Sequence, residues 1–388
     1  MKKIFIILSV LIIFKANVLL AENDKNKAEW TIMVFMNGGR LFEPFAEKDI
    51  NEMKKIGSSE KVNVVALFEC CDKPSKLLYI KKNSYDVLKS YSNLNAGDYN
   101  VLLNFFKESC ERYPARKYML VMWRHGQVWI RPGKGGNRYY DEISKSQKTG
   151  IKISINDFSI VLKQIADLIG HKIDVLGMDI NMMQKYEYWL NLKDYVNYYI
   201  ASEEGVPGNG WCYDIILKKI IDNPKVSPKE LSSFIVNSYK ENYINRESAT
   251  LSAIDLNNFE EVNKYLNIIA SELIEIIKNP KMKISVMDAI KNVQRFQNDD
   301  YCDLVDFFDK LILEFNKQNF KNKTGIFEKT RDIITNRLVI ASCFCNGGVQ
   351  NSHGVAIYLP LSYVYEGYKK LDAYKLKWSK FIEAVIKN

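Results

Sequence analysis

Short apolar runs alternate with segments of helical periodicity along the first half of the chain. Five runs contain mainly aliphatic, Met and aromatic residues, and each is bounded by polar residues or glycine: residues 30–36, 62–68, 118–123, 173–178 and 198–201. Runs of this length and composition are typical of strands that are buried on both faces. The pattern therefore predicts five strands of one central sheet.

The segments between these runs carry apolar residues at helical spacing. One helix is expected after the first run, with its apolar positions from Phe45 to Ile56 on one face. A second is expected before the fourth run, between Asn156 as its N-cap and Gly170 just past its end. The alternation of strands and helices predicts an α/β fold, in which a mostly parallel sheet has helices on both faces.

Beyond about residue 260 the pattern becomes helical. Two long amphipathic stripes follow, and a last apolar run at residues 354–359 predicts a strand that ends before Pro360. No stretch rich in glycine or proline, which would indicate a flexible linker, separates this region from the first part of the chain. We therefore expect a sheet domain at residues 27–260 and a helical C-terminal appendage with a returning strand at residues 261–388, packed against that domain.

The first residues have the features of an export signal. Lys2 and Lys3 precede an apolar run at residues 4–14, and Ala21 is followed by polar residues. The apolar run is too short to span a bilayer, which takes roughly 20 residues. We therefore expect a signal peptide at residues 1–21 and a protein that is exported, either to the periplasm or out of the cell.

The composition is that of a folded protein of 388 residues, with 47% apolar residues and a formal net charge of +9. Loss of residues 1–21 removes three lysines and no acid, so +9 becomes +6. The remaining lysines are spread along the chain, and no aromatic–basic motif of the RNA-binding kind occurs. We expect a solvated basic surface, no nucleic-acid partner, and membrane-surface contact only through the N-terminal segment.

Seven cysteines and three histidines do not form a zinc pattern. Cys70 and Cys71 are adjacent, and Cys343 and Cys345 are separated by one residue on an expected strand. Neither spacing is that of a metal site. We expect buried thiols that act as small apolar residues, with one or two disulfides as the alternative. No cofactor and no metal ion is predicted.

Nine short motifs follow one another in order along the chain. They are Trp30–Gly38, Asp49–Met53, Tyr118–Gly126, Asp174–Asp179, Ala201–Glu204, Pro207–Trp211, Leu251–Asp255, Tyr301–Phe307 and Gly354–Pro360. A set of motifs in this order is far more specific than any one of them. On these motifs the sequence resembles the clostripain-type cysteine peptidases (peptidase C11, in the caspase-like clan) along nearly its whole length after the signal segment.

The resemblance implies a caspase-like fold and a His–Cys dyad that cleaves after Arg or Lys. Carried over to this chain, His125 is the dyad base, Gly126 belongs to the oxyanion region, and Asp179 lines the pocket for the basic side chain. The position of the family's cysteine holds Asn181, and Arg124 stands where the family has an aspartate. An amide has no proton to give up and is a poor nucleophile, so the covalent route is closed.

Other acids have simpler interpretations. Glu203 and Glu204 follow a predicted strand, so they are candidates to line the same pocket, or they are solvated. Asp303 and Asp306 precede an apolar helix, where acids in the first turn interact favourably with the helix dipole.

The prediction is therefore a pseudopeptidase that keeps an acidic pocket and binds peptides or proteins with exposed Arg or Lys. Two alternatives remain. In one, Cys212, which follows the turn at Pro207–Trp211, is a substitute nucleophile, and the protein is an active cysteine endopeptidase that cleaves after Arg or Lys. In the other, the scaffold has been adapted to envelope structure or to contact with another partner.

Overall fold

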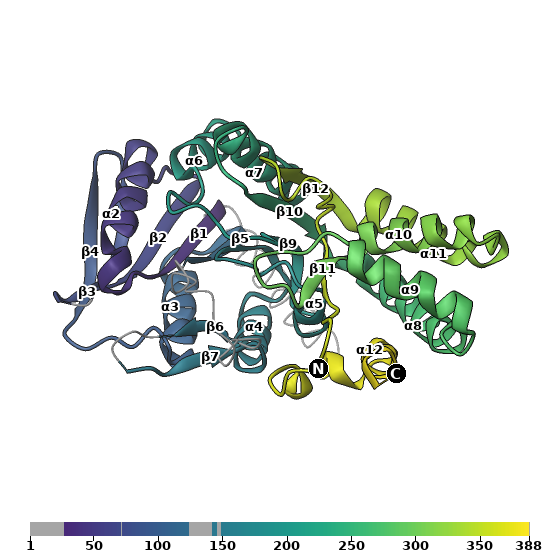
Figure 1. Ribbon diagram of the computed structural model, residues 1–388. Coiled ribbons are helices and arrows are strands. Elements are labelled where there is room, and N and C mark those ends of the chain that lie inside the picture. Colours follow the sequence, from purple (N-terminus) through teal and green to yellow (C-terminus); the bar gives the residue numbers. More distant parts are fainter. Residues whose placement is uncertain (1–26, 71, 124–141, 146–148, 388) are drawn as a thin grey trace, which may run out of the picture.

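The computed structural model describes residues 27–387, except residue 71, residues 124–141 and residues 146–148. Within this part of the chain, nine strands form one mixed sheet in the order β12–β10–β9–β8–β5–β1–β2–β3–β4 (Figure 1). Their bounds are β1 (Ala28–Asn37), β2 (Val62–Glu69), β3 (Ser75–Lys81), β4 (Ser84–Tyr91), β5 (Ala115–Trp123), β8 (Ile173–Asp179), β9 (Val196–Ala201), β10 (Thr250–Asp255) and β12 (Val339–Phe344). The expected signal segment, Arg124, His125 and Gly126 lie outside the described residues.

The five strands predicted from apolar runs form the centre of the sheet. Strands β2, β1, β5, β8 and β9 run parallel to one another. Nearly all of their side chains are buried or half-buried, because helices cover both faces of the sheet. The predicted α/β fold with a mostly parallel sheet is confirmed.

The outer strands are antiparallel, and the sequence analysis did not place them in the sheet. Strands β3 and β4 form a hairpin beside β2, while β10 and β12 extend the other edge beyond β9. Most side chains of β4 are exposed, so this strand has no apolar run that a sequence pattern could detect. Strand β12 comes from the region after residue 260, so the C-terminal region adds a strand to the central sheet.

Helices cover both faces of the sheet, as predicted. One face carries α2 (Gly39–Ile56), α6 (Tyr213–Asp222) and α7 (Pro228–Tyr243), and the other carries α3 (Tyr99–Arg112), α4 (Ile155–Ile169) and α5 (Tyr186–Leu192) (Figure 1). Each layer packs its apolar side chains against its own face of the sheet, which gives two apolar cores. A short hairpin of β6 (Glu142–Lys145) and β7 (Lys152–Ser154) precedes α4.

The helix α4 begins earlier than the sequence analysis expected. Its N-cap is Ser154, whose hydroxyl accepts a hydrogen bond from the backbone N–H of Asp157 at 3.1 Å. The Asp157 carboxylate in turn accepts from the backbone N–H of Ser154 at 3.1 Å, which completes a capping box. Asn156, the predicted cap, lies inside the first turn, so that assignment was wrong. Gly170 ends the helix in a left-handed conformation, as expected.

The region after residue 260 packs directly on the sheet domain. Its helices are α8 (Phe259–Ile276), α9 (Pro280–Asn292), α10 (Leu304–Lys317), α11 (Gly325–Ile333) and α12 (Lys377–Lys387), and short 3-10 or π turns occur at residues 256–258, 321–323, 334–338, 368–370 and 372–375. Side chains of α8, α10 and α12 belong to the same apolar core as those of α4 and α5. The predicted last strand is present as β13 (Ala356–Tyr358), which pairs with β11 (Tyr301–Asp303) in a small separate sheet.

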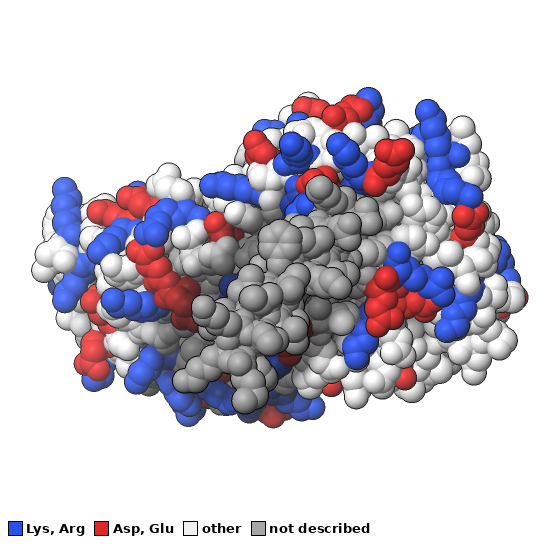
Figure 2. Space-filling model, turned by 180° about the vertical axis from the view of Figure 1, so that it is seen from behind, with Lys and Arg blue, Asp and Glu red and all other residues white. Residues whose placement is uncertain are grey.

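The surface is mixed in charge. On the face shown in Figure 2, Lys and Arg side chains lie among Asp and Glu side chains, as expected for solvated basic residues. No helix in the described part of the chain is both long enough and apolar enough to cross a bilayer.

Candidate active site

The ends of β5 and β8 lie side by side at the carboxyl edge of the sheet. Trp123, the last residue of β5, is the register partner of Asp179, the last residue of β8. The expected base, His125, would follow Trp123 by two residues but lies outside the described part of the chain. Asn181 follows Asp179 by two residues. Adjacent parallel strand ends of this kind are where α/β proteins place their chemistry.

Asp179 is buried beneath the turn that precedes α6. Its side chain is 2% exposed, and its Oδ2 accepts hydrogen bonds from the backbone N–H of Trp211 at 3.1 Å and the hydroxyl of Tyr213 at 3.0 Å. Burial raises the pKa of Asp179 to about 7. Gly210 has a φ of +60°, and a Cβ there would lie 2.8 Å from Asp179 Oδ2. The Pro-Gly-Asn-Gly-Trp turn therefore brings its backbone against the carboxylate in a way that other residues could not.

A second buried acid, Asp49, lies near Asp179, and with Glu52 these two residues form an acidic cluster. It comes from α2 and is 1% exposed, and its Oδ2 accepts a hydrogen bond from Trp123 Nε1 at 2.7 Å. Burial, and then the charge of Asp179, raise the pKa of Asp49 to about 8. Glu52, one turn along the helix, accepts from the backbone N–H of Tyr213 at 3.2 Å. This role of Asp49 was not predicted from the sequence.

Asn181 holds the turn after β8 against the loop after β9. Its half-buried side chain accepts, through Oδ1, a hydrogen bond from the backbone N–H of Val206 at 2.7 Å. The next residue, Met182, has a φ of +53° and donates its N–H to the carbonyl of Glu204 at 3.0 Å. A left-handed conformation is unusual for methionine, so these contacts fix the backbone of the turn.

Glu203 and Glu204 bond to the C-terminal region rather than to the residues around Asp179. Glu203 is 3% exposed and accepts from the backbone N–H of Gly354 at 3.0 Å. Glu204 accepts from the N–H groups of Gly205 at 2.8 Å and Gln297 at 2.9 Å. Their role in ligand binding stays a prediction, and the hydrogen bonds that they make join β9 to the second half of the chain.

The described cysteines are free thiols, and five of them are buried: Cys70, Cys110, Cys302, Cys343 and Cys345. Cys212, which is less buried, stands at the N-cap of α6. Burial, and then the charge of Glu52, raise the pKa of Cys212 to about 11. Within the described residues, no group of three or more His, Cys, Asp or Glu side chains has the arrangement of a metal site.

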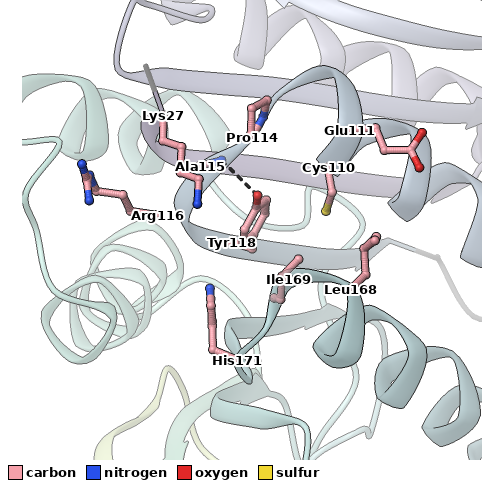
Figure 3. Close-up of a pocket in the computed structure, with 10 residues that line it drawn as sticks. All are labelled: Lys27, Cys110, Glu111, Pro114, Ala115, Arg116, Tyr118, Leu168, Ile169 and His171. Atoms are coloured by element: carbon pink, nitrogen blue, oxygen red, sulfur yellow. Dashed lines mark hydrogen bonds between the residues drawn. The ribbon is translucent and has the colours of Figure 1, made fainter. Parts of the chain in front are cut away.

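A cavity of about 390 Å³ lies at the opposite end of β5 (Figure 3). It is lined by Ala115 and Arg116 at the start of this strand, and the backbone N–H of Ala115 donates to the hydroxyl of Tyr118 at 2.9 Å. His171 lines it just before β8 begins. The full length of two strands separates this cavity from Asp179, so it is not part of the candidate active site.

Comparisons with known proteins agree with this architecture. A family model described as the clostripain family matches residues 34–384. Among solved structures, a secreted C11 cysteine protease from Bacteroides thetaiotaomicron in complex with an irreversible peptide inhibitor has a TM-score of 0.64 at 18% identity, over 93% of this chain and 100% of that chain. An inactive zymogen C11 protease from Parabacteroides distasonis has a TM-score of 0.65 at 17% identity, over 92% and 98%. A comparison with curated proteins gives no match.

Proposed function

Because this chain belongs to the clostripain family of peptidases, we propose that it is a family member that binds peptides with exposed Arg or Lys and does not cut them. The observation that carries this proposal is Asn181, which occupies the position where the family resemblance places the nucleophilic cysteine. The acidic cluster at the end of β8 supplies the charge for a basic side chain.

The chemistry of Asn181 argues against peptide hydrolysis. Covalent catalysis by this family needs a thiolate, and an amide has neither an ionisable proton nor comparable nucleophilicity. The amide oxygen of Asn181 is also engaged with the backbone N–H of Val206. The Asn181 side chain therefore stabilises the turn after β8 and is not a nucleophile.

The charge around Asp179 supports a basic ligand. Asp179 is buried, and burial raises its pKa to about 7, so a nearby cation would favour its ionised form. An Arg or Lys side chain would supply that cation. Export is part of the proposal, because residues 1–21 have the pattern of a signal peptide and a similar structure is that of a secreted protease.

The alternative of an active peptidase that uses Cys212 is less well supported. A catalytic thiol normally has a pKa lowered towards neutrality by nearby positive charge. Cys212 has the reverse environment, since burial and the neighbouring acids Glu52 and Asp214 raise its pKa to about 11. The other alternative, a repurposed scaffold, predicts no preference for basic peptides.

The proposal is tested by hydrolysis and binding measured on the same preparation. We expect no release of chromophore from Arg- or Lys-ended substrates above the blank, and measurable binding of the same peptides. Hydrolysis that Cys212→Ser abolishes would establish the active-peptidase alternative. Absence of both hydrolysis and binding would favour the repurposed scaffold.

A restored nucleophile tests the position of Asn181 directly. In the double variant Asn181→Cys, Cys212→Ser, we expect covalent labelling by an electrophile attached to an arginine residue, and much weaker labelling by its norleucine counterpart. The matched control is Cys212→Ser alone, which should not be labelled. Full activity is not expected, because misplacement by about 1 Å can cost roughly a hundredfold in rate. Equal labelling of variant and control would show that residue 181 is not at the nucleophile position.

A further inference from the structure

The two buried aspartates of the candidate site each have one carboxylate oxygen that is not hydrogen-bonded. In Asp49 and Asp179, Oδ2 is bonded as described above, whereas Oδ1 has no hydrogen-bond partner among the described residues. Both side chains are nearly inaccessible, at 1% and 2% exposure. Buried polar atoms in folded proteins are nearly always paired. Other buried polar atoms of the described residues also lack a partner, among them Trp211 Nε1 and Glu203 Oε1. Asp49 and Asp179, however, are two acids of which one raises the pKa of the other, so their free oxygens point to a missing cation.

Among the described residues, no cation is bonded to either free oxygen, although the charge of Lys48 lowers the pKa of both aspartates. Lys48, on the same helix as Asp49, forms its ion pair with Glu52 at 3.0 Å. The charges of Glu52 and of the two aspartates add unfavourably, since each raises the pKa of a neighbour. A buried pair of carboxylates is tolerated when it shares a proton or holds a cation.

We propose that Asp49 is the second carboxylate of the ligand pocket, and that the guanidinium or ammonium group of the ligand lies between the free oxygens of Asp49 and Asp179. This inference rests on the proposed function, that the site takes a basic side chain. A guanidinium group carries several N–H donors in a planar fork, so it can bond to both aspartates at once. The pocket should therefore prefer Arg over Lys.

Binding should then be linked to proton release. With pKa values of about 8 and about 7, the pair of Asp49 and Asp179 holds between one and two protons at pH 7 when no ligand is present. A cation between the two oxygens favours the fully ionised pair and displaces these protons. Affinity should rise from pH 6, by up to roughly tenfold per pH unit for each proton displaced, and level off above about pH 8.

Within the described residues, the other titratable groups around the pair do not obscure this effect. Lys48 and Glu52 face it from α2, and Cys212 and Tyr213 face it from the start of α6. Tyr239 and Tyr243, on α7, also interact with Asp179. Burial raises the pKa of the thiol and of all three hydroxyls, so these four groups stay neutral between pH 6 and 8.5.

Calorimetric titration of the purified protein with an Arg-ended peptide tests the inference. Titrations at pH 7 in buffers of different ionisation enthalpy count the protons that are released. A peptide that ends in citrulline, the neutral isostere of Arg, is the control ligand. We expect release of between one and two protons per Arg peptide, none for citrulline, and at least tenfold tighter binding of the Arg peptide.

Variants separate the role of Asp49 from a merely structural one. At pH 8, Asp49→Asn should bind the Arg peptide at least tenfold more weakly than the wild type and should keep only the part of the pH dependence that comes from Asp179, while Asp49→Glu should recover part of both. Glu47→Gln makes the same change of charge on the same helix at a half-exposed side chain, so it should bind like the wild type. Circular dichroism confirms that each variant is folded.

Failure of the inference differs from failure of the proposed function. If the wild type binds Arg and citrulline peptides equally, or binds neither, both are wrong. If the wild type prefers the Arg peptide but releases no proton, or if folded Asp49→Asn binds it within twofold of the wild type, Asp49 is not part of the pocket and only the inference fails. The proton count needs no variant, so it decides the question even if Asp49→Asn does not fold.

Discussion

Two pairs of buried acids near the carboxyl edge of the sheet differ in the groups that bond to their carboxyl oxygens. Asp49 and Asp179 accept from an indole, a backbone amide and a phenol, and each keeps an unpaired oxygen among the described residues. Glu203 and Asp303 face one another; Glu203 also keeps an unpaired oxygen, Oε1, among these residues, whereas Asp303 bonds to His353, whose Nδ1 lies 3.0 Å from Asp303 Oδ1. The second pair thus has a histidine for a partner, and the first has no cation bonded to it.

We interpret the pair of Asp49 and Asp179 as a ligand site, and the pair of Glu203 and Asp303 as a structural contact between two parts of the chain. Burial, and then the charge of Asp303, raise the pKa of Glu203 well above its usual range, so Glu203 carries a proton that the pair shares. Gly354 donates its N–H to Glu203, which ties the segment before β13 to the end of β9. This pair therefore stabilises the contact between the C-terminal region and the sheet. Leaving the other pair unsatisfied costs stability, as is common at binding sites.

The largest expected effect is that of Asp303→Ala on stability. Asp303 is fully buried and accepts from the backbone N–H of Asp306 at 2.7 Å and from both the backbone N–H and Nδ1 of His353. Removal of one partner from a buried charged network costs about 3–5 kcal/mol. We expect a loss of that size in the free energy of unfolding, measured by urea denaturation.

The control for this variant is Asp309→Ala on α10, the helix that Asp303 caps. The Asp309 side chain is 41% exposed and pairs with Arg331 at 2.9 Å, so its loss should cost less than about 1 kcal/mol. Similar losses in the two variants would show that the pair of Glu203 and Asp303 is no more structural than a surface ion pair.

Asp49→Asn is expected to raise the free energy of unfolding, which is the opposite of the effect of Asp303→Ala. A carboxyl group whose pKa is higher in the folded state than in the unfolded state contributes stability that is present below its unfolded pKa and is lost as pH rises through the folded pKa. For Asp49 this window runs from about pH 4 to about pH 8. The variant should therefore be more stable than the wild type at pH 8, by about 1–3 kcal/mol, and this advantage should shrink towards pH 5.

Urea denaturation at several pH values measures this difference without a ligand. If Asp49→Asn is less stable than the wild type at every pH, the Asp49 carboxylate is a structural group like Asp303, and the contrast between the two pairs is lost. A gain in stability together with a loss of affinity for Arg peptides would show that Asp49 binds the ligand and does not stabilise the fold.

The sequence predicted those features that depend on continuous apolar runs. Five parallel strands were found because burial on both faces leaves an unbroken apolar pattern, and the positions of Asp179 and Asn181 followed from the end of one such strand. The hairpin of β3 and β4 was not predicted, because β4 exposes most of its side chains and has no such pattern. The N-cap of α4 was misplaced by two residues, since Ser154 and Asn156 are both good capping residues.

The roles of the buried acids could be predicted only in part. Asp49 lies on an amphipathic helix, where an acid has the same local pattern whether it faces solvent or a neighbouring strand end. Its partner Trp123 is 74 residues away in the chain. Asp303 was correctly expected at the start of a helix, where it is the N-cap, but its contact with His353 spans 50 residues and leaves no local signal.

The smallest expected effect is that of His353→Gln, which tests the cation of the second pair. Burial alone would lower the pKa of His353, but the hydrogen bond and charge of Asp303, with further charge from Asp306 and Asp309, outweigh burial and raise it above 6.5. A histidine with a raised pKa contributes stability that is fully present below its unfolded pKa and is lost as pH rises through the folded pKa. Because the His353 side chain is 35% exposed, solvent screening limits the contribution to about 1 kcal/mol.

The stability difference between wild type and His353→Gln should be largest near pH 6 and should decline towards pH 8, whereas that for Asp49→Asn grows over the same range. His171→Gln, at an exposed histidine at the other end of the sheet, is the control. A His353→Gln difference that does not change with pH would mean that the imidazole is neutral, and that the second pair, like the first, is held by a shared proton alone.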